Sequence, residues 1–465
     1  FNRGGYLFLQ DERLYSALIE TFGTWKADMP ATNSSLEFTA GHSWQQFDRE
    51  YRWTQGFRLA QEGDDWIYTE DITNDSFLVE NRLISFFGRL NYTHNDRYLL
   101  TASLRRDGSS RFGEANRWGL FPAVALGWRI LEEDFASNWD KLFSNLKLRV
   151  SWGITGNENI GDFLYNTFYE FGTPDAAYQF GDEFVPTLRG RGVDPDIKWE
   201  QTTSLNIGID FGFLNNRLSG SIEGYRKYTN DLLFTVAASA FTNLSDRILT
   251  NIGEMENIGI ELQLDAVVID QKDFSWDLGF NFAHNRNEIK KLDNSTDPNF
   301  LGYEDGGISG DIGQTIQVLK VGESIETFRT FKHILNENGL PLADGTDYNG
   351  DGLIDNLDIY EDLNGDGLIN ENDLLPGKSA LPDFIFGLTS NLRYQNWDLA
   401  ATFRANLGNY VYNNVASGAG YFQRLTDRVT NNIHESAFIV DFTERQLRSD
   451  YYIEDASFLR LDNVS

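Results

Sequence analysis

The sequence predicts an all-β protein, a transmembrane antiparallel β-barrel, from three observations. Apolar and polar residues alternate along many segments, as they do in strands that bury only one face. These segments run for roughly nine to eleven residues, the length that a tilted membrane strand needs, whereas soluble strands average about five or six. Short turns also interleave with long polar segments, which is the loop pattern of a barrel that spans a membrane.

The first clear alternation lies in residues 84–105 and forms a predicted hairpin. Apolar residues occupy the even positions on both sides of a short turn at residues 94–97, and mostly polar residues fall between them, so one face is apolar and the other polar. The apolar positions are Ile84, Phe86, Leu90, Tyr92, Tyr98, Leu100, Ala102 and Leu104. The same alternation recurs over residues 118–129, 146–155, 204–211, 258–265, 274–282, 384–394 and 397–403.

A soluble β-sandwich also alternates, and two further features favour the membrane. Aromatic residues lie at strand ends beside short turns, as an interfacial girdle requires; examples are the pairs Tyr92 with Tyr98 and Tyr394 with Trp397. Ionisable residues fall on the polar parity, where a wet or plugged lumen would accept them: Arg89, Arg105, Arg129, Arg149, Glu261 and Asp265. We therefore predict a membrane barrel.

Three long polar segments, residues 107–116, 156–199 and 285–326, are predicted to be outward-facing loops, where binding residues would lie. No second periodic domain is evident, so residues 1–465 are interpreted as one partial outer-membrane β-barrel with long extracellular loops. The chain begins with Phe1 rather than Met and ends within an apparent strand, so we expect a fragment.

Composition excludes several classes of protein. The formal net charge is −31, from 70 acidic and 39 basic residues, which argues against nucleic acid or an anionic membrane surface as partner. Cysteine is absent, which excludes disulfides and thiolate metal sites. No run of eighteen apolar residues occurs, which excludes a transmembrane helix.

A set of blocks that keep their order along the chain, beginning with GRLNY at residues 88–92 and YLLTASLRRDGSSRFG at residues 98–113, resembles the SusC/RagA family of TonB-linked outer-membrane transporters. These first two blocks form the hallmark stretch. Further blocks are FP at 121–122, GWRI at 127–130, LKLR at 146–149, GN at 156–157, WE at 199–200, NIG at 206–208, NIGIE at 257–261, DLNGDG at 362–367 and SFLRL at 457–461.

The resemblance implies a barrel of 22 strands with an amino-terminal plug, in the outer membrane of a Bacteroidetes-type bacterium. Proteins similar to this one import oligosaccharides or peptides, pair with a SusD-like surface lipoprotein that covers the barrel, and are driven by TonB from the periplasm. The resemblance also suggests a dimer of barrel-and-lid pairs embedded in outer-membrane lipid. This sequence shows no plug and no TonB-contacting segment, so contact with the TonB complex is expected through a missing amino-terminal region.

Residues 344–376 contain a tandem of acidic loops with calcium-loop spacing. Oxygen-bearing side chains occupy loop positions 1, 3, 5, 9 and 12, where carboxylates can converge on a hard cation, and Gly at position 6 permits the sharp turn. The first loop supplies Asp347, Asn349, Asp351, Asp355 and Asp358; the second supplies Asp362, Asn364, Asp366, Asn370 and Asp373. Position 12 is Asp rather than Glu, which makes bidentate ligation less assured. We expect structural calcium here; ordinary acidic turns are the alternative.

Other candidate residues carry weaker signals. Arg106, Asp107 and Arg111 of the hallmark are expected to organise a loop by charge-assisted hydrogen bonds. Seven loop aromatics could stack on sugar rings or pack against other protein: Trp66, Tyr68, Tyr178, Phe180, Tyr303, Tyr421 and Phe422. The five histidines (His42, His94, His284, His333 and His434) have no metal-site spacing and are expected at the surface or in the lumen.

No nucleophile elbow, phosphate-binding loop or dinucleotide-binding glycine pattern occurs, so the chain is predicted not to be an enzyme. The leading hypothesis is import across the outer membrane. The alternative is a passive surface-binding or adhesion barrel without TonB coupling.

Overall fold

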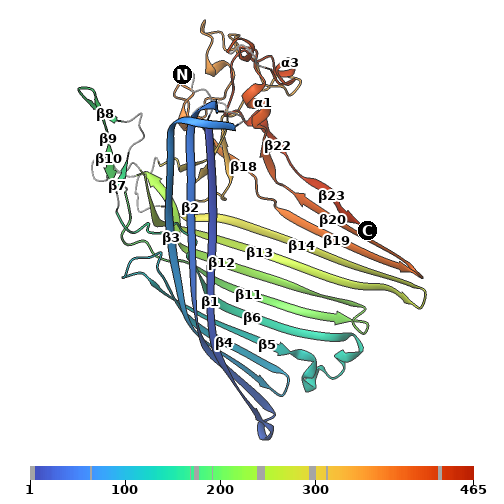
Figure 1. Cartoon of the computed structure of the whole chain (residues 1–465). Helices are drawn as coiled ribbons and strands as arrows, with labels where there is room; N and C mark the ends of the chain where they lie inside the picture. The colour runs from blue at the N-terminus through green and yellow to red at the C-terminus, as the bar shows by residue number, and fades with distance from the viewer. Residues whose placement is uncertain are drawn as a thin grey trace. The chain divides into compact units, whose positions relative to one another are not determined.

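The computed structural model describes residues 6–62, 65–167, 169–171, 177–190, 192–237, 247–292, 300–309, 313–427 and 432–465. Its main feature is a 13-stranded sheet with the order β1-β2-β3-β4-β5-β6-β11-β12-β13-β14-β19-β20-β23 (Figure 1). Strands pair antiparallel along β1-β2-β3-β4 and along β13-β14-β19-β20-β23. The predicted all-β class is therefore confirmed. Among the described residues, no helix has the length and apolar character needed to cross a membrane.

The strands of the large sheet are β1 (Tyr6–Met29), β2 (Ser34–Glu62), β3 (Asp65–His94), β4 (Tyr98–Ser109), β5 (Trp118–Arg129), β6 (Phe143–Asn157), β11 (Glu200–Phe213), β12 (Leu218–Ala237), β13 (Arg247–Gln271), β14 (Phe274–Lys291), β19 (Phe384–Tyr394), β20 (Trp397–Leu407) and β23 (Phe458–Val464). The smaller strands are β7 (Tyr169–Phe171), β8 (Ala177–Phe180), β9 (Glu183–Pro186), β10 (Leu188–Gly190), β15 (Tyr303–Gly307), β16 (Thr315–Leu319), β17 (Thr327–Thr330), β18 (Leu375–Ser379), β21 (Tyr410–Tyr412) and β22 (Ile453–Asp455).

The helices are short. They are α1 (Asn414–Ala419), α2 (Arg424–Asp427) and α3 (Ala437–Val440). The 3-10 turns are η1 (Pro30–Thr32), η2 (Ile130–Glu132), η3 (Asp134–Ala136), η4 (Trp139–Lys141), η6 (Asn356–Asp358), η7 (Glu371–Asp373) and η8 (Asp450–Tyr452).

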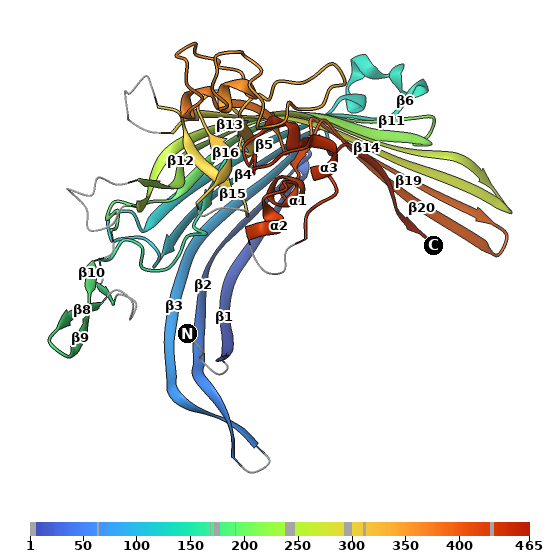
Figure 2. The same cartoon turned by 90° about the horizontal axis from the view of Figure 1, so that it is seen from above.

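The predicted hairpins are present with the predicted turns. The end of β3 pairs with the start of β4, and Tyr92 lies opposite Leu100. The turn residues Asn95 and Asp96 both have a φ of 53°, a left-handed conformation that these side chains tolerate better than most. Strands β14, β19 and β20 likewise follow one another in register and lie side by side in both views (Figures 1 and 2).

Two sets of boundaries differ from the prediction. Strands β1, β2 and the first part of β3 were not predicted, because both faces of β1 carry exposed apolar residues, such as Leu18 and Ile19, and simple alternation is lost. The segments predicted to be loops also contain strands: β4 continues to Ser109, residues 156–199 include β7 to β10, and residues 285–326 include the end of β14 with β15 and β16.

The apolar parity of the large sheet has no protein cover. In β11, for example, Leu205, Ile207 and Ile209 are 42%, 50% and 42% exposed. A continuous exposed apolar face is costly in water, so this face is the side that meets lipid.

The chain divides into two compact units, residues 1–127, 151–203 and 231–251 in the first and residues 128–150, 204–230 and 252–465 in the second. The core of the first unit lies at the loop ends of its strands and contains Phe112, Phe121, Ile160, Ile197 and Trp199. The core of the second unit contains Ile316, Phe328, Tyr412, Ala416, Tyr421, Val440, Phe442 and Tyr452. Both cores are formed largely by the segments between the long strands.

Candidate functional site

The two acidic loops each fold around their own first residue. In the first loop, Asp347 accepts backbone N–H bonds from Gly350 (2.6 Å) and Gly352 (3.0 Å). Both glycines have positive φ values, 79° and 88°, which glycine adopts without strain. The side chain of Asn349 accepts from the N–H of Asp351 at 2.9 Å. The side chains predicted to bind calcium, Asp347 and Asn349, therefore accept hydrogen bonds from the backbone of their own loop.

The second loop repeats this geometry at the corresponding residues. Asp362 accepts from Gly365 (2.7 Å) and Gly367 (2.8 Å), and Asn364 accepts from the N–H of Asp366 (2.9 Å). Asn370 then accepts from the N–H of Asn372, as Asp355 does from Leu357 in the first loop. The sequence repeat is therefore a structural repeat.

The last residue of each loop is buried and closes it. Asp358 is 2% exposed; Oδ1 accepts from the N–H groups of Tyr348 and Asn349, and Oδ2 from that of Asp355. These N–H donors lower the pKa of Asp358 below its ordinary value. Asp373 is 0% exposed and accepts from Leu363 and Asn370. Both loops thus end in a capping box on a 3-10 turn.

The side-chain hydrogen bonds of all ten predicted ligands stay inside their own loops. Across the described ranges, no three His, Cys, Asp or Glu side chains are gathered as a metal centre would gather them. The predicted set also uses asparagine side chains and a backbone carbonyl, so calcium at these loops remains a prediction.

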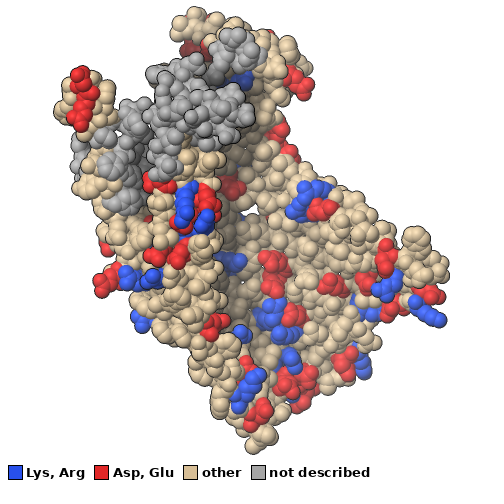
Figure 3. All heavy atoms as spheres, in the orientation of Figure 1, with Lys and Arg blue, Asp and Glu red and all other residues tan. Residues whose placement is uncertain are grey.

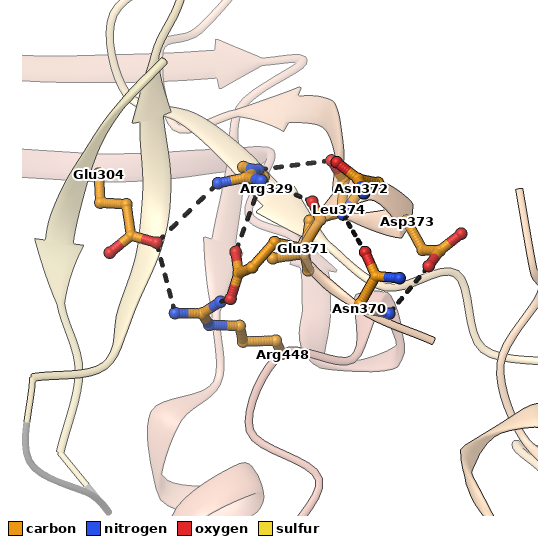
Figure 4. A network of polar contacts seen from close by, with 8 residues as sticks. All are labelled: Glu304, Arg329, Asn370, Glu371, Asn372, Asp373, Leu374 and Arg448. Atoms are coloured by element: carbon orange, nitrogen blue, oxygen red, sulfur yellow. Dashed lines mark hydrogen bonds and ion pairs between the residues drawn. The ribbon is translucent and has the colours of Figure 1, made fainter. Parts of the chain in front are cut away.

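A second feature, missed in the sequence, anchors the second loop (Figure 4). The guanidinium of Arg329 on β17 donates to the backbone carbonyls of Glu371 (2.7 Å) and Leu374 (3.4 Å). Arg448 Nη1 donates to Glu371 Oε1 at 2.7 Å, and Glu304 on β15 lies 3.9 Å from Arg329 and 3.6 Å from Arg448. Two cations and two carboxylates therefore hold the loop against the four-stranded sheet.

The cationic side chain at the centre of this anchor, Arg329, is buried. The side chain of Arg329 is 7% exposed, and desolvation lowers its pKa from the ordinary value while Glu371 and Glu304 oppose that change. No local pattern reveals such a cluster, because its residues come from four separate segments of the chain. A lone arginine on a strand looks the same in sequence whether it is exposed or buried.

The segments that flank the first loop are linked to the segment near residue 449 by a buried histidine. His333 is 3% exposed; its Nδ1 lies 2.9 Å from Ser449 Oγ and its Nε2 lies 3.0 Å from the carbonyl of Leu342. Tyr360, two residues beyond Asp358, donates to Gln446 at 2.8 Å. The expectation that His333 lies at the surface or in the lumen was therefore wrong, since burial among Tyr360 and Phe442 makes it a core residue.

The polar parity of the large sheet carries paired charges. Arg149 on β6 donates to Asp210 on β11 and to Glu223 on β12, and Lys147 lies 3.9 Å from Asp210. A second network on β12 to β14 joins Arg226, Glu256, Lys290 and Glu288. Figure 3 shows acidic and basic side chains in small mixed groups rather than as a field of one sign. Such a face offers hydrogen bonds to a hydrated solute.

The loop aromatics separate into different environments. Tyr178 and Phe180 on the β8–β9 hairpin are 67% and 68% exposed and are free to contact a solute. Tyr421 is 2% exposed and belongs to a core, so the sugar-stacking hypothesis was wrong for it. Tyr303 packs edge-on against Phe300 and Phe422 against Phe438. The side chains of Trp66 and Tyr68 lie outside the described residues.

The three hallmark residues have different roles. Arg111 organises the loop as predicted, since its guanidinium donates to Asp162 and to the carbonyl of Glu158, both at 3.0 Å. Asp107 accepts two bonds from Arg105. Arg106 was predicted to act in the same loop, but its guanidinium lies 4.8 Å from the Trp118 ring centroid on the apolar parity. Its position in the strand, one residue from Arg105, puts it on the opposite face.

Comparison with known proteins connects this fold to a family. A family model described as TonB dependent receptor-like, beta-barrel, matches residues 2–423. The TonB-dependent receptor SusC of Bacteroides thetaiotaomicron is 39% identical over 420 residues, which cover 87% of this chain and 40% of that protein. The TonB-dependent receptor P39 of Formosa agariphila is 32% identical over 439 residues, covering 84% of this chain and 40% of that protein.

A solved structure shares the fold. The RagAB peptide transporter superposes with a TM-score of 0.76 at 21% sequence identity, covering 99% of this chain and 49% of that one. The chain spans about two fifths of the length of the two relatives SusC and P39. The chain belongs to the family of TonB-dependent receptor β-barrels, proteins of the bacterial outer membrane.

Proposed function

We propose that this chain is the barrel part of a TonB-dependent importer that carries oligosaccharides or peptides across the outer membrane with a SusD-like surface lipoprotein. The observation that carries the proposal is the 39% identity to a TonB-dependent receptor, SusC, over 87% of the chain. TonB would act through an amino-terminal region outside this chain, and two barrel-and-lid pairs would form a dimer.

The polar face of the sheet supports this function physically. Its charges are paired across strands, as with Arg149, Asp210 and Glu223, so it presents donors and acceptors without a strong field of one sign. A hydrated sugar or peptide can exchange water for such groups at little net cost, and it is not trapped by an apolar surface. Transport of this kind needs no covalent step.

Uptake by source cells that express the full-length protein tests the proposal. Labelled oligosaccharides and labelled peptides are supplied separately, with and without a proton uncoupler and in a strain without TonB. An importer takes up one class, and both treatments abolish the uptake. A passive binding or adhesion barrel would retain surface label that neither treatment changes.

Gentle detergent extraction and native mass spectrometry test the partner. The full-length protein is expected to retain a lipoprotein of the SusD type, in pairs that themselves form dimers. Recovery of the barrel alone under conditions that preserve other outer-membrane complexes would contradict the partnership.

The same preparation is expected to leave oligosaccharides and peptides intact, because we propose no catalytic role. Hydrolysis that is lost when a loop carboxylate is substituted would contradict this expectation.

We also propose that the tandem loops bind calcium and that the ion orders the insert at residues 344–376. The support is the oxygen spacing, the repeated geometry of both loops, and the exposure of Asp351, Asp355 and Asp366. Asp358 and Asp373 each use their oxygens on backbone donors, but a carboxylate oxygen has a second lone pair that remains available to a cation. The ion would supply only charge neutralisation and cross-linking of the loop.

Calorimetry and limited proteolysis of the full-length protein test the calcium proposal. Calcium is expected to bind and to protect the insert, and a chelator is expected to expose it. The double variant Asp347→Asn and Asp362→Asn should lose both effects. Asp398→Asn, an exposed carboxylate on β20, serves as the control and should keep them. Equal proteolysis with calcium and with chelator in the unaltered protein would contradict the proposal.

A further inference from the structure

Two neighbouring arginines on β4 lie on opposite faces of the sheet and have different surroundings. Arg105 faces the polar side, where its Nε donates to both oxygens of Asp107 (2.7 and 2.9 Å) and its Nη2 to Ser85 (2.7 Å). Arg106 lies on the apolar parity, and its guanidinium lies over the ring of Trp118. Within the described ranges no carboxylate is paired with Arg106. A cation on the lipid-facing side of the sheet therefore lacks a protein counter-ion.

Arg106 lies beside a row of aromatic rings that crosses neighbouring strands. His42 on β2 lies opposite Phe86 on β3, and Phe86 lies opposite Arg106. The ring centroid of Phe86 lies 6.3 Å from the centroid of His42 and also 6.3 Å from that of Trp118. Trp118 lies flat on Gly108, where a Cβ would be 2.9 Å from the indole.

On β4 and β5 this row is found at the strand ends next to the loop at residues 110–117, away from the short turn near Asn95, whereas β2 and β3 continue beyond it. Aromatic rows of this kind mark the level of lipid head groups, where the hydrocarbon of the membrane meets water. A guanidinium in such a row is therefore at the depth of lipid phosphates.

A groove begins beside this row on the same face. Gly88 lies opposite Ala40 and Leu104, and in the next row Leu90 lies opposite Phe38 and Ala102. The small side chains Ala40, Gly88 and Ala102 leave a cavity of about 590 Å³. Its margin is formed by Phe38, Phe86, Leu90, Leu104, Arg106 and Leu120. The lining residues on the apolar parity are apolar except Arg106, which lies at one end of the groove; Arg89 and Ser103, on the polar parity, also contribute to the lining.

We propose that this groove holds an acyl chain of a membrane lipid whose phosphate is bound by Arg106. An unpaired charge on a lipid-facing surface is unfavourable, and a lipid phosphate at the head-group level relieves this cost. The planar guanidinium matches phosphate oxygens in a bidentate geometry, and the apolar groove gains stability from each methylene that it covers.

The overall net charge of −31 makes the chain a poor general binder of anions, so the inference concerns one local site. The combination decides the occupant. An apolar groove alone would accept any lipid tail, and a lone arginine would accept any anion. Both together select a molecule that carries an acyl chain and a phosphate.

Native mass spectrometry of the delipidated full-length protein tests the site, with phosphatidylglycerol as the probe and diacylglycerol of the same chains as its phosphate-free counterpart. One phosphatidylglycerol is expected to bind above the background of diacylglycerol. Arg106→Gln should weaken phosphatidylglycerol about tenfold, the effect of losing a charge-assisted hydrogen bond, and leave diacylglycerol unchanged. The affinity of Arg106→Lys for phosphatidylglycerol should lie between that of the unaltered protein and that of Arg106→Gln.

Two more variants separate the groove from the charge. Gly88→Leu fills the hollow, since the nearest atoms to its Cβ position are 3.9 and 4.0 Å away, and it should weaken both lipids while leaving the barrel folded. Arg49→Gln, on the neighbouring strand β2 at the polar parity and outside the lining of the groove, is the matched control and should change neither.

Three results would overturn the proposal. The first is equal binding of phosphatidylglycerol and diacylglycerol, which would indicate unselective annular lipid. The second is equal phosphatidylglycerol binding by the unaltered protein and by Arg106→Gln, or a loss in Arg49→Gln equal to that in Arg106→Gln. The third is binding of inorganic phosphate alone with the same dependence on Arg106, which would show that the acyl chain has no part. The heat-dependent gel mobility of each variant establishes that it is folded.

Discussion

The strands of the large sheet and the acidic insert at residues 344–376 hold charged groups in different ways. In the sheet, Arg149 reaches Asp210 and Glu223 because the register of neighbouring strands places them side by side. In the insert, carboxylates are satisfied by backbone N–H groups of their own loop, and single residues from distant segments, such as Arg329, fix the loop in place. Loss of one cation should therefore be local in the sheet but should release the insert.

The largest expected effect is that of Arg329→Met. The substitution removes the donors to two backbone carbonyls and leaves Glu304 and Glu371 facing only Arg448. Breaking a buried ionic cluster from one side costs about 3 kcal/mol. Hydrogen exchange should show lost protection over residues 300–380 with the long strands unchanged. A uniform loss over both regions would contradict the proposed independence of the insert.

A smaller effect is expected in the sheet from Gly108→Val. The new Cβ would lie 2.9 Å from the indole of Trp118, so the ring must move. Overpacking of this kind costs about 2 kcal/mol. The temperature at which the barrel loses its folded gel mobility should fall. Gly23→Ala on β1 is the control, because no atom lies within 4 Å of its Cβ position, and an equal fall there would refute the steric explanation.

A third prediction concerns the pH dependence of the first loop. The folded pKa of Asp358 is below its ordinary value, so its contribution to stability is present above the unfolded pKa of about 3.9 and is lost as pH falls through the folded pKa. Asp358→Asn should destabilise the insert at pH 7, because the amide offers one oxygen where the carboxylate offers two to the N–H donors.

Proteolysis of the insert at a series of pH values provides the measurement for Asp358→Asn. The variant should be cut faster than the unaltered protein at pH 7, and the difference should shrink below about pH 4. A difference that stays constant down to the acid limit would show that the carboxylate charge is not involved.

The smallest effect is expected for an exposed ion pair in the sheet. Arg393 and Asp398 lie 3.2 Å apart with side chains 70% and 77% exposed. Because water screens such pairs, Arg393→Met should change stability by less than about 0.5 kcal/mol. A double-mutant cycle with Asp398→Asn measures the coupling energy of the pair. A coupling energy near the loss of stability expected for Arg329→Met would remove the contrast between the two regions.

Alternation along the chain was enough to predict the class of fold and most of the long strands from Ile84 onward. It failed for β1, where Leu18 and Ile19 lie on opposite faces and are both exposed, so no parity is apolar alone. The physical reason is that a period-two pattern appears only where the two faces of a strand differ in polarity, and the two faces of β1 differ little.

The candidate site was predicted in part for a related reason. The ten acidic-loop residues were found because their contacts lie within fifteen residues and leave a spacing in the sequence. Glu371 was passed over although it belongs to the second loop, since its partners Arg329 and Arg448 come from far along the chain. The face to which Arg106 points was implied by its parity, but the hallmark stretch drew attention to the loop instead.

The lengths of β2 and β3, 29 and 30 residues, have a consequence for how this protein meets its surroundings. At about 3.3 Å per residue the hairpin extends for roughly 100 Å, whereas the hydrocarbon of a membrane is about 30 Å thick. Most of this ribbon must therefore stand in water, beyond the level at which lipid supports it. Such a ribbon would offer proteases and antibodies a long stretch of backbone that no lipid covers.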